Sequence, residues 1–306
     1  MASIKKLEGI RATADIQEKI RLSQWRIIEW YDHWKGNVYV AFSGGKDSTV
    51  LLHLVRELYP EVPAVFSNTG LEYPEIVEFV RKVPNVTWVR PKMSFAKVLK
   101  VYGYPVVSKT QATYIREIRT AYDLGHEHWV NQRLHGVRRD GGKTKFKLAK
   151  RWRFLLDAPF KISEKCCNVI KKNPMKRYAK ETGRHGILGI MAAESWMRRH
   201  QILKYGCNGF ELSEPQSRPL AFWTDDDIRA YIDANGLRIS PIYDTGVDRT
   251  GCMFCCFGVH MEDEPNRFQR MQRSHPKLWR YCTEKLRIGE VLDFMSVPWR
   301  LEEHDE

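Results

Sequence analysis

One short stretch near the start of the chain carries the groups that a phosphate-binding turn needs. Residues 37–42 form an apolar run typical of a β-strand, and the leucines and valine at 51, 54, 55 and 58 recur at helical spacing. A turn between a strand and a helix presents backbone N–H groups at the positive end of the helix, and these groups bind anions. The turn and first helical residues are Ser43, Gly44, Gly45, Lys46, Asp47, Ser48 and Thr49. Glycines let an anion approach the backbone closely and the lysine adds a full charge, so we expect a phosphate site here.

Thiol groups form a second set of candidate ligands. The adjacent pair Cys166-Cys167 is separated by residues 168–251, which is 84 positions, from the pair Cys252 and Cys255. Thiolates bind soft metals, and two close pairs can complete a four-ligand site. Zinc seldom uses adjacent cysteines, because both sulfurs must face one ion, whereas a four-iron cluster offers separate iron corners. An iron-sulfur site is therefore favoured over zinc or buried core cysteines, and Cys256 competes with Cys255 for the fourth position.

A third segment, Arg133 to Arg153, is basic and contains aromatic residues. Opposed only by Asp140, its cations include Arg138, Arg139, Lys143, Lys145, Lys147, Lys150, Arg151 and Arg153. Trp152 and Phe154 lie among them, and such a segment can follow a nucleic-acid backbone and stack on bases. The net charge of +13 also favours a polyanionic partner, either nucleic acid or an acidic or nucleoprotein surface. The alternative is a solvated, flexible insertion.

The composition is that of a soluble globular protein. The chain has 306 residues, of which 43% are hydrophobic and 28% charged, and a mean hydropathy of -0.48. No apolar run reaches the roughly 18 residues of a membrane span, and the first ten residues lack the apolar stretch of a signal peptide. We therefore expect a cytoplasmic protein with no membrane partner, in which seven reduced cysteines serve metal binding or catalysis. The sequence leaves the oligomeric state open, and a dimer is compatible with it.

Strands and helices alternate over the first hundred residues. After an opening helix at 11–35, with an apolar stripe at Ile16, Ile20, Ile27, Tyr31 and Trp34, strands are expected at 37–42, 63–68 and 86–90 and helices at 74–82 and 94–101. This alternation predicts an α/β fold with a parallel, doubly wound sheet, whose ligands bind beyond the carboxyl ends of the strands. Further along, helices are expected at 166–182, from about 194, at 224–234 and at 264–286, with a strand at 186–190. We expect three parts: a helical segment at 1–36, a nucleotide-binding domain at 37–223 with a basic insertion at about 105–160, and a region at 224–306 that completes the cysteine site.

The turn S-G-G-K-D-S resembles the pyrophosphate-binding loop of the ATP pyrophosphatase superfamily, also called the adenine nucleotide alpha hydrolases. The commoner phosphate loop, G-x-x-x-x-G-K-S/T, does not fit, because Val40 stands at its first glycine and Asp47 follows Lys46. The resemblance implies that the loop holds the leaving pyrophosphate of ATP while a nucleophile attacks the alpha phosphorus.

The cysteine pattern, C-C followed by C-x-x-C, resembles the 4Fe-4S ligand set of the iron-sulfur branch of the phosphoadenosine phosphosulfate (PAPS) reductase family, including its phage and mobile-element members. Three further motifs are similar to motifs of this family. Residues 189–198 resemble G-I-R-x-x-E-S-x-x-R, with Met191 in place of the first arginine, and residues 218–228 resemble R-P-L-x-x-W-T-x-x-D-I. Residues 240–252 resemble the segment that leads to the second cysteine pair. A fourth, 68–75, resembles D-T-G-x-x-F-P-E with Asn68 in place of the aspartate. The nucleotide-binding residues that the resemblance implies, beyond the loop, are Asn68, Gly70, Gly189, Glu194, Arg198 and Arg218.

Three functions follow from these resemblances. The first is an ATP pyrophosphatase that adenylates an acceptor, with sulfur transfer to nucleic acid as one version. In this enzyme Lys46 and Mg²⁺ would neutralise the phosphates, and Asp47 would hold Mg²⁺ or order the loop. Arg198 and Arg218 would hold the alpha phosphate or the acceptor. The second is an APS or PAPS reductase, which the intact loop and the missing C-terminal E-C-G-x-H cysteine disfavour, since Cys282 lies in a predicted helix. The third is a nucleic-acid-binding accessory protein that keeps a nucleotide site.

Overall fold

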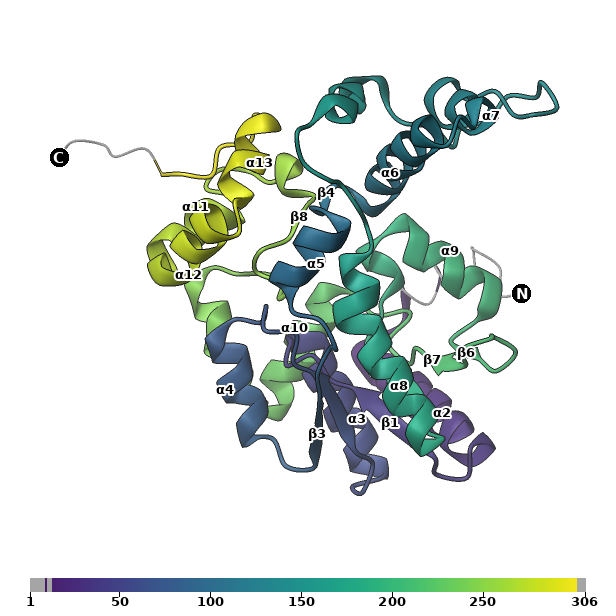
Figure 1. Cartoon of the computed structure of the whole chain (residues 1–306). Coiled ribbons are helices and arrows are strands. Elements are labelled where there is room, and N and C mark those ends of the chain that lie inside the picture. The colour runs from purple at the N-terminus through teal and green to yellow at the C-terminus, as the bar shows by residue number, and fades with distance from the viewer. Residues whose placement is uncertain (1–8, 10–12, 302–306) are drawn as a thin grey trace. The chain divides into compact units, whose positions relative to one another are not determined.

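A computed structural model describes residue 9 and residues 13–301 (Figure 1). Residues 11 and 12, the expected start of the opening helix, lie outside the described residues. The chain folds into two compact units, each assembled from separate stretches. Unit 1 takes residues up to Asn68, then Glu72–Pro91 and Asn173–Thr250; unit 2 takes Thr69–Leu71, Lys92–Lys172 and the residues from Gly251 onward. This grouping differs from the expected division at residues 36 and 223.

Unit 1 is built on a sheet whose order, within the described residues, is β3-β2-β1-β5-β7-β6. All neighbouring strands are parallel except β6, which runs antiparallel to β7. The strands are β1 (Val38–Ala41), β2 (Ala64–Ser67), β3 (Val86–Val89), β5 (His185–Leu188), β6 (Asn208–Gly209) and β7 (Gln216–Ser217). The helices are α2 (Ile16–His33), α3 (Lys46–Leu58), α4 (Pro74–Lys82), α8 (Asn173–Thr182), α9 (Trp196–Tyr205) and α10 (Asp225–Asn235), with short 3-10 turns η4 (Ala192–Glu194) and η5 (Pro241–Thr245). The expected α/β fold with a doubly wound, mostly parallel sheet is confirmed.

The order of the strands reverses at β1. The chain moves outward from β1 to β2 and β3 and then returns to place β5 on the other side of β1. Right-handed crossovers put helices on opposite faces of the sheet on the two sides of such a switch point. On one face Tyr178 of α8 packs with Tyr39 and Val65. The segments that follow β1 and β5 leave the sheet side by side at its carboxyl edge, where open α/β sheets bind ligands.

The buried stripe of α2 differs from the expected one. The buried residues are Lys19, Ser23, Ile27 and Trp30, so only Ile27 of the predicted stripe lies on it. The polar members are buried because they have partners in unit 1: the Lys19 ammonium pairs with Asp227 at 2.8 Å, and the Ser23 hydroxyl accepts the indole N–H of Trp223 at 2.9 Å. The other residues of the expected stripe are half-buried, so apolar periodicity predicted the buried side in part and missed Lys19, because a paired lysine can be a core residue.

Unit 2 is mainly helical and pairs β4 (Val106–Val107) with β8 (Cys256–Phe257) in parallel. Its α-helices are α5 (Phe95–Tyr102), α6 (Lys109–Asp123), α7 (Glu127–Val130), α11 (Arg267–Ser274), α12 (Pro276–Arg280) and α13 (Ile288–Phe294). Its π-helical turns are η1 (Asn131–His135), η3 (Asn168–Lys172) and η7 (Tyr281–Lys285), and its 3-10 turns are η2 (Lys150–Asp157) and η6 (Val259–Met261). The helix expected at 264–286 is broken between α11 and α12 at Pro276, which has no N–H to continue the helical ladder.

No helix among residues 13–301 is long and apolar enough to cross a membrane.

Candidate nucleotide site and cysteine cluster

The expected phosphate turn lies between β1 and α3, and its own hydroxyl groups hold it in shape. The Ser48 hydroxyl donates to the Gly45 carbonyl at 2.9 Å and accepts the Ser43 N–H at 3.2 Å, and Thr49 donates to the same carbonyl at 3.0 Å. Gly45 is the N-cap of α3, and no side chain caps the helix there. Ser48 and Thr49 therefore order the loop at the positive end of α3, the end of a helix at which anions bind.

Tyr243 and Thr250, which were not among the expected site residues, lie over the turn. The Lys46 N–H donates to the Tyr243 hydroxyl at 2.7 Å, and that hydroxyl lies 3.4 Å from the Thr250 hydroxyl. A methyl group on Gly45 would come within 2.5 Å of the Thr250 oxygen, so only glycine fits. Both residues lie in the 240–252 motif, whose family resemblance concerns the second cysteine pair and does not indicate a contact with the loop.

Charged side chains gather at the start of α3. The Lys46 ammonium is 3.3 Å from a carboxylate oxygen of Asp225 and donates to the Asp248 carbonyl at 3.3 Å. Arg249 pairs with the other oxygen of Asp225 at 3.6 Å. Lys46 is buried, so Asp225 and Asp248 hold its charge in place beside the loop.

Asp47 is the carboxylate of the loop, and its pKa is raised from the ordinary value. Burial raises its pKa, and Asp225 raises it further, while Lys46, Arg249 and Arg198 act in the opposite direction. One of its oxygens, Oδ1, is buried with no hydrogen-bond partner among the described residues. A buried carboxylate oxygen without a donor is costly, and a bound cation or a donor on a ligand would satisfy it.

The segment after β5 reaches the same loop. A methyl group on Gly189 would lie 3.2 Å from the Asp47 carbonyl oxygen, so glycine permits the close approach of the two chains. Glu194 accepts the Met191 N–H at 2.9 Å and forms an ion pair with Arg198. Arg198 acts electrostatically on Asp47, while Met191, which replaces the family's arginine, is buried and apolar.

The remaining predicted nucleotide-binding residues lie elsewhere along the strand ends. The Asn68 N–H donates to the Val89 carbonyl at 2.9 Å and so extends the ladder between β2 and β3. Gly70, which belongs to unit 2, has a φ of 76°, a conformation that favours glycine. Arg218 is buried at the end of β7, and its guanidinium donates to the Gly206 carbonyl at 3.5 Å. Its expected contact with phosphate stays a prediction.

All four predicted cysteine ligands belong to unit 2. The Cys166 thiol is 4.0 Å from the Cys167 sulfur, and the Cys255 N–H donates to the Cys252 carbonyl at 3.1 Å, which closes a tight turn. The hydrogen bond from Cys166 lowers the pKa of Cys167, and Lys109 and Lys171 lower it further. The pKa of Cys166 is raised by Cys167 first, then by burial and by the charges of Cys255 and Cys252. The two pairs therefore interact, although no three histidine, cysteine or acidic side chains of the described residues are close enough to hold a metal ion as they stand.

Cys255 and Cys256 have different surroundings. Cys256 is fully buried in β8, where it pairs in register with Val106, and burial raises its pKa well above the usual range. Burial also raises the pKa of Cys255, which feels the charge of Cys167, and Arg267 donates to its carbonyl oxygen at 3.0 Å.

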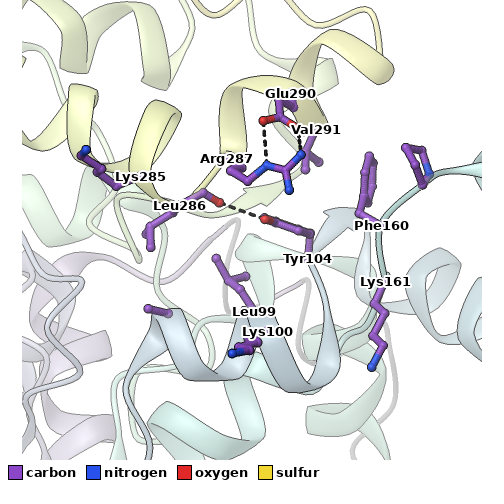
Figure 2. Close-up of a pocket in the computed structure, with 12 residues that line it drawn as sticks. Leu99, Lys100, Tyr104, Phe160, Lys161, Lys285, Leu286, Arg287, Glu290 and Val291 are labelled. Carbon is purple, nitrogen blue, oxygen red and sulfur yellow. Dashed lines mark hydrogen bonds and ion pairs between the residues drawn. The ribbon is translucent and has the colours of Figure 1, made fainter.

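A cavity of about 530 Å³ lies in unit 2, away from the predicted site residues (Figure 2). Its lining comes from α5, residues 159–161 and residues 285–291. The Tyr104 hydroxyl donates to the Leu286 carbonyl at 2.9 Å, and Arg287 pairs with Glu290 at its edge (Figure 2). Lys161 and Lys285 lie on opposite sides of the view, so the cationic groups of the cavity do not converge on one point.

The chain thus has an α/β fold with a mostly parallel sheet and a glycine turn at its switch point. A family model described as "Phosphoadenosine phosphosulfate reductase domain" matches residues 37–154 and 113–257, which together exceed half of the chain. The chain belongs to this family.

Several relatives and solved structures are similar to this chain. Two uncharacterized proteins of Methanocaldococcus jannaschii are each 25% identical over 91% and 85% of this chain, and the chain spans about half of their length, 55% and 45%. An adenosine 5'-phosphosulfate reductase of Mycolicibacterium smegmatis is 24% identical over 75% of both chains. Among solved structures, a PAPS reductase from Candida auris has a TM-score of 0.45 at 18% identity, covering 82% of this chain and 96% of its own. A U34-tRNA thiolase from Methanococcus maripaludis, solved with its 4Fe-4S cluster, has a TM-score of 0.40 at 15% identity, covering 91% and 80%.

Proposed function

We propose that the protein is an ATP pyrophosphatase, which binds ATP at the turn 43–49 and cleaves it to pyrophosphate and an adenylyl group carried to an acceptor. The observation that carries the proposal is the arrangement around Asp47, whose buried oxygen lacks a partner while Lys46, Arg198 and Arg249 all act on it. Three cations at the positive end of a helix favour a ligand with several negative charges.

The roles of the chain's own groups follow from their positions. The N–H groups at the start of α3 and the Lys46 ammonium would hold the two outer phosphates and take up the charge that develops on the leaving pyrophosphate. Arg198 and Arg249 would hold the alpha phosphate while the acceptor attacks it. Asp47 would take a Mg²⁺ ion at its unpartnered oxygen, and the ion supplies charge neutralisation on the phosphates. With that ion bound, the buried carboxylate of Asp47 would have a cation as its partner.

The test uses protein purified without oxygen and titrated with Mg-ATP in a calorimeter, followed by assay of alpha-labelled ATP for AMP and pyrophosphate. Lys46→Ala should lose ATP binding, because the buried ammonium is held at the loop by Asp225 and Asp248. Lys82→Ala, which removes an exposed lysine of α4, is the matched control and should bind normally. Absence of ATP binding by the unchanged protein would refute the proposal.

A sulfonucleotide reductase is the second candidate, since the chain resembles adenosine 5'-phosphosulfate reductases over three quarters of its length. The same calorimeter separates the two, because a reductase prefers the sulfonucleotide to ATP. Conversion of that sulfonucleotide to sulfite and AMP with added thiol, without ATP binding, would establish the reductase.

We further propose that Cys166, Cys167, Cys252 and Cys255 hold a 4Fe-4S cluster. The fit rests on the donor set: two thiol pairs in one unit that interact electrostatically, with Lys109, Lys171 and Arg267 acting on them. Nearby cations favour an anionic occupant such as a thiolate-ligated cluster. The cluster would order unit 2 and supply either a redox centre or a structural one.

Cys255→Ser and Cys256→Ser make a matched pair for this second proposal. Cys255→Ser should lose most of the iron and the brown absorbance of anaerobically purified protein, whereas Cys256→Ser should keep both, since Cys256 lies in the buried ladder of β8. The opposite pattern would assign the fourth ligand to Cys256, and no iron in the unchanged protein would refute the cluster.

A further inference from the structure

The basic segment that the sequence singled out forms an ordered hairpin, residues 136–147, which extends beyond α7 in Figure 1. Val137 bridges Lys143 in antiparallel register, and the Arg138 N–H donates to the Gly142 carbonyl at 2.8 Å. The Asp140 carboxylate accepts the Gly142 N–H at 2.9 Å and closes the turn. The only acidic residue of the hairpin therefore has a structural role.

Arg133 anchors the base of the hairpin. Its guanidinium pairs with Glu117 at 2.5 Å, lies over the rings of Tyr114 and Trp129 at 4.8 and 5.6 Å, and donates to the Phe146 carbonyl at 3.2 Å. A cation stacked and paired in this way is fixed in position. The backbone on either side of Phe146 is thereby held against α6, so the side chains of the hairpin extend from a backbone that is fixed in position.

Arg151 lies over the ring of Trp152 at 5.1 Å, and the other cations of the segment fall into two groups. Lys147 and Arg153 donate to the carbonyls of His135 and Leu134, so they stabilise the fold in the same way as Arg133. Arg138 lies 3.4 Å from Asp140, and both are more than half exposed. The other group is exposed and has no carboxylate within ion-pairing distance among the described residues: Arg139, Lys143, Lys145 and Lys150.

Aromatic side chains are exposed beside these cations. Phe146 is 69% exposed, and it stands between Lys145 and Lys147 in the sequence. Trp129 is 41% exposed at the base of the hairpin, where Arg133 lies over its ring. A flat exposed ring flanked by ammonium groups fits a nucleobase whose phosphates bind the neighbouring lysines.

We propose that this hairpin and Trp129 form a binding surface for single-stranded nucleic acid. Arg139, Lys143, Lys145 and Lys150 contact phosphates, and Phe146 stacks on an unpaired base. Single strands are favoured over duplex because the base faces that a ring can stack on are covered in a duplex. An acidic protein would pair with the lysines but gives no reason for the exposed ring between them. The surface does not depend on the proposed ATP chemistry.

The test measures fluorescence anisotropy of labelled oligonucleotides of about 12 nucleotides, single-stranded RNA and DNA, with no ATP present. Four phosphate contacts at about −0.7 each predict that log K falls with log salt with a slope of about −2.8. Lys143→Ala with Lys145→Ala should make the slope shallower by about 1.4. Phe146→Ala should weaken binding roughly tenfold at every salt concentration and leave the slope unchanged.

The matched control removes two exposed cations from the same unit, Lys277→Ala with Arg280→Ala on α12. This control should keep the slope of the unchanged protein; an equal loss in both double variants would show a response to net charge alone and overturn the proposal. Phe146→Ala with unchanged affinity, tighter binding of duplex than of single strand, or equal binding of polyglutamate would overturn it as well. Lys46→Ala should keep full affinity, so the ATP proposal and this one fail separately. Stronger binding of RNA or of DNA identifies the natural polymer.

Discussion

Replacing Tyr243 with phenylalanine should tighten the binding of inorganic pyrophosphate. The Lys46 N–H, one of the donors that an anion at the turn would use, donates to the Tyr243 hydroxyl at 2.7 Å. An anion must displace this hydroxyl before it can accept the N–H. Tyr243→Phe removes the competitor and leaves the ring that packs beside the loop.

The size of the effect follows from the bond that is lost. A neutral hydrogen bond contributes a net of about 0.5–1.5 kcal/mol, which corresponds to binding tighter by about 2- to 13-fold. Burial raises the pKa of Tyr243 above its usual value of 10.0, so the hydroxyl is neutral at pH 7 and charge repulsion adds nothing. The contact with Thr250, at 3.4 Å, is too long to change this estimate much.

Calorimetric titration of pyrophosphate into both proteins measures the ratio of dissociation constants. Tyr231→Phe is the matched control, because its hydroxyl bonds to His53 and Glu57 on α3 and does not reach the turn. Weaker binding by Tyr243→Phe, with the control unchanged, would refute the reasoning, since it would mean that the hydroxyl donates to the anion.

Three further predictions concern unit 1. Lys19→Ala should lower the free energy of unfolding, measured by urea denaturation, by about 3 kcal/mol, because it leaves the carboxylate of Asp227 buried without its cation. The control Arg26→Ala breaks an exposed ion pair and should lower it by less than about 1 kcal/mol. Equal losses in the two variants would contradict the argument. Asp47→Asn should stabilise the ligand-free protein more at pH 7 than at pH 4. Burial raises the pKa of Asp47 in the folded state above the ordinary 3.8, so the native state binds the proton more tightly than the unfolded state does. The unchanged protein therefore loses stability as the pH rises through this raised pKa, and asparagine, which has no charge, does not. A difference in Tm between the two proteins that does not change with pH would contradict it. Gly189→Ala should weaken ATP binding by about 1 kcal/mol, since its methyl group would press on the Asp47 carbonyl from 3.2 Å; unchanged calorimetric affinity would show that the loop yields freely.

Local sequence patterns predicted most of the fold. Helix α4 lies where Pro74 and the following apolar spacing place it, and α10 begins at the Thr224 capping box and ends before Gly236 in the left-handed conformation. These signals are local, because they depend on a cap, a turn or a residue without an N–H. The α2 stripe was predicted only in part for the converse reason: the burial of Lys19 depends on Asp227, which lies 208 residues away.

The sequence by itself determined the glycine turn, the strand before it and the helix after it, because the residue types of one short stretch specify all three. It also determined the family, through motifs whose residues stand at set spacings. Only the tertiary structure decided what surrounds Lys46: Tyr243, Asp225 and Arg249 come from segments about 180 to 200 residues further along, and they reach the loop because α10 packs against α3 and η5 against α4. The tertiary structure likewise divided the basic segment into cations that hold the fold and cations that face solvent, since a lysine's role depends on which carbonyl or carboxylate folding brings within reach.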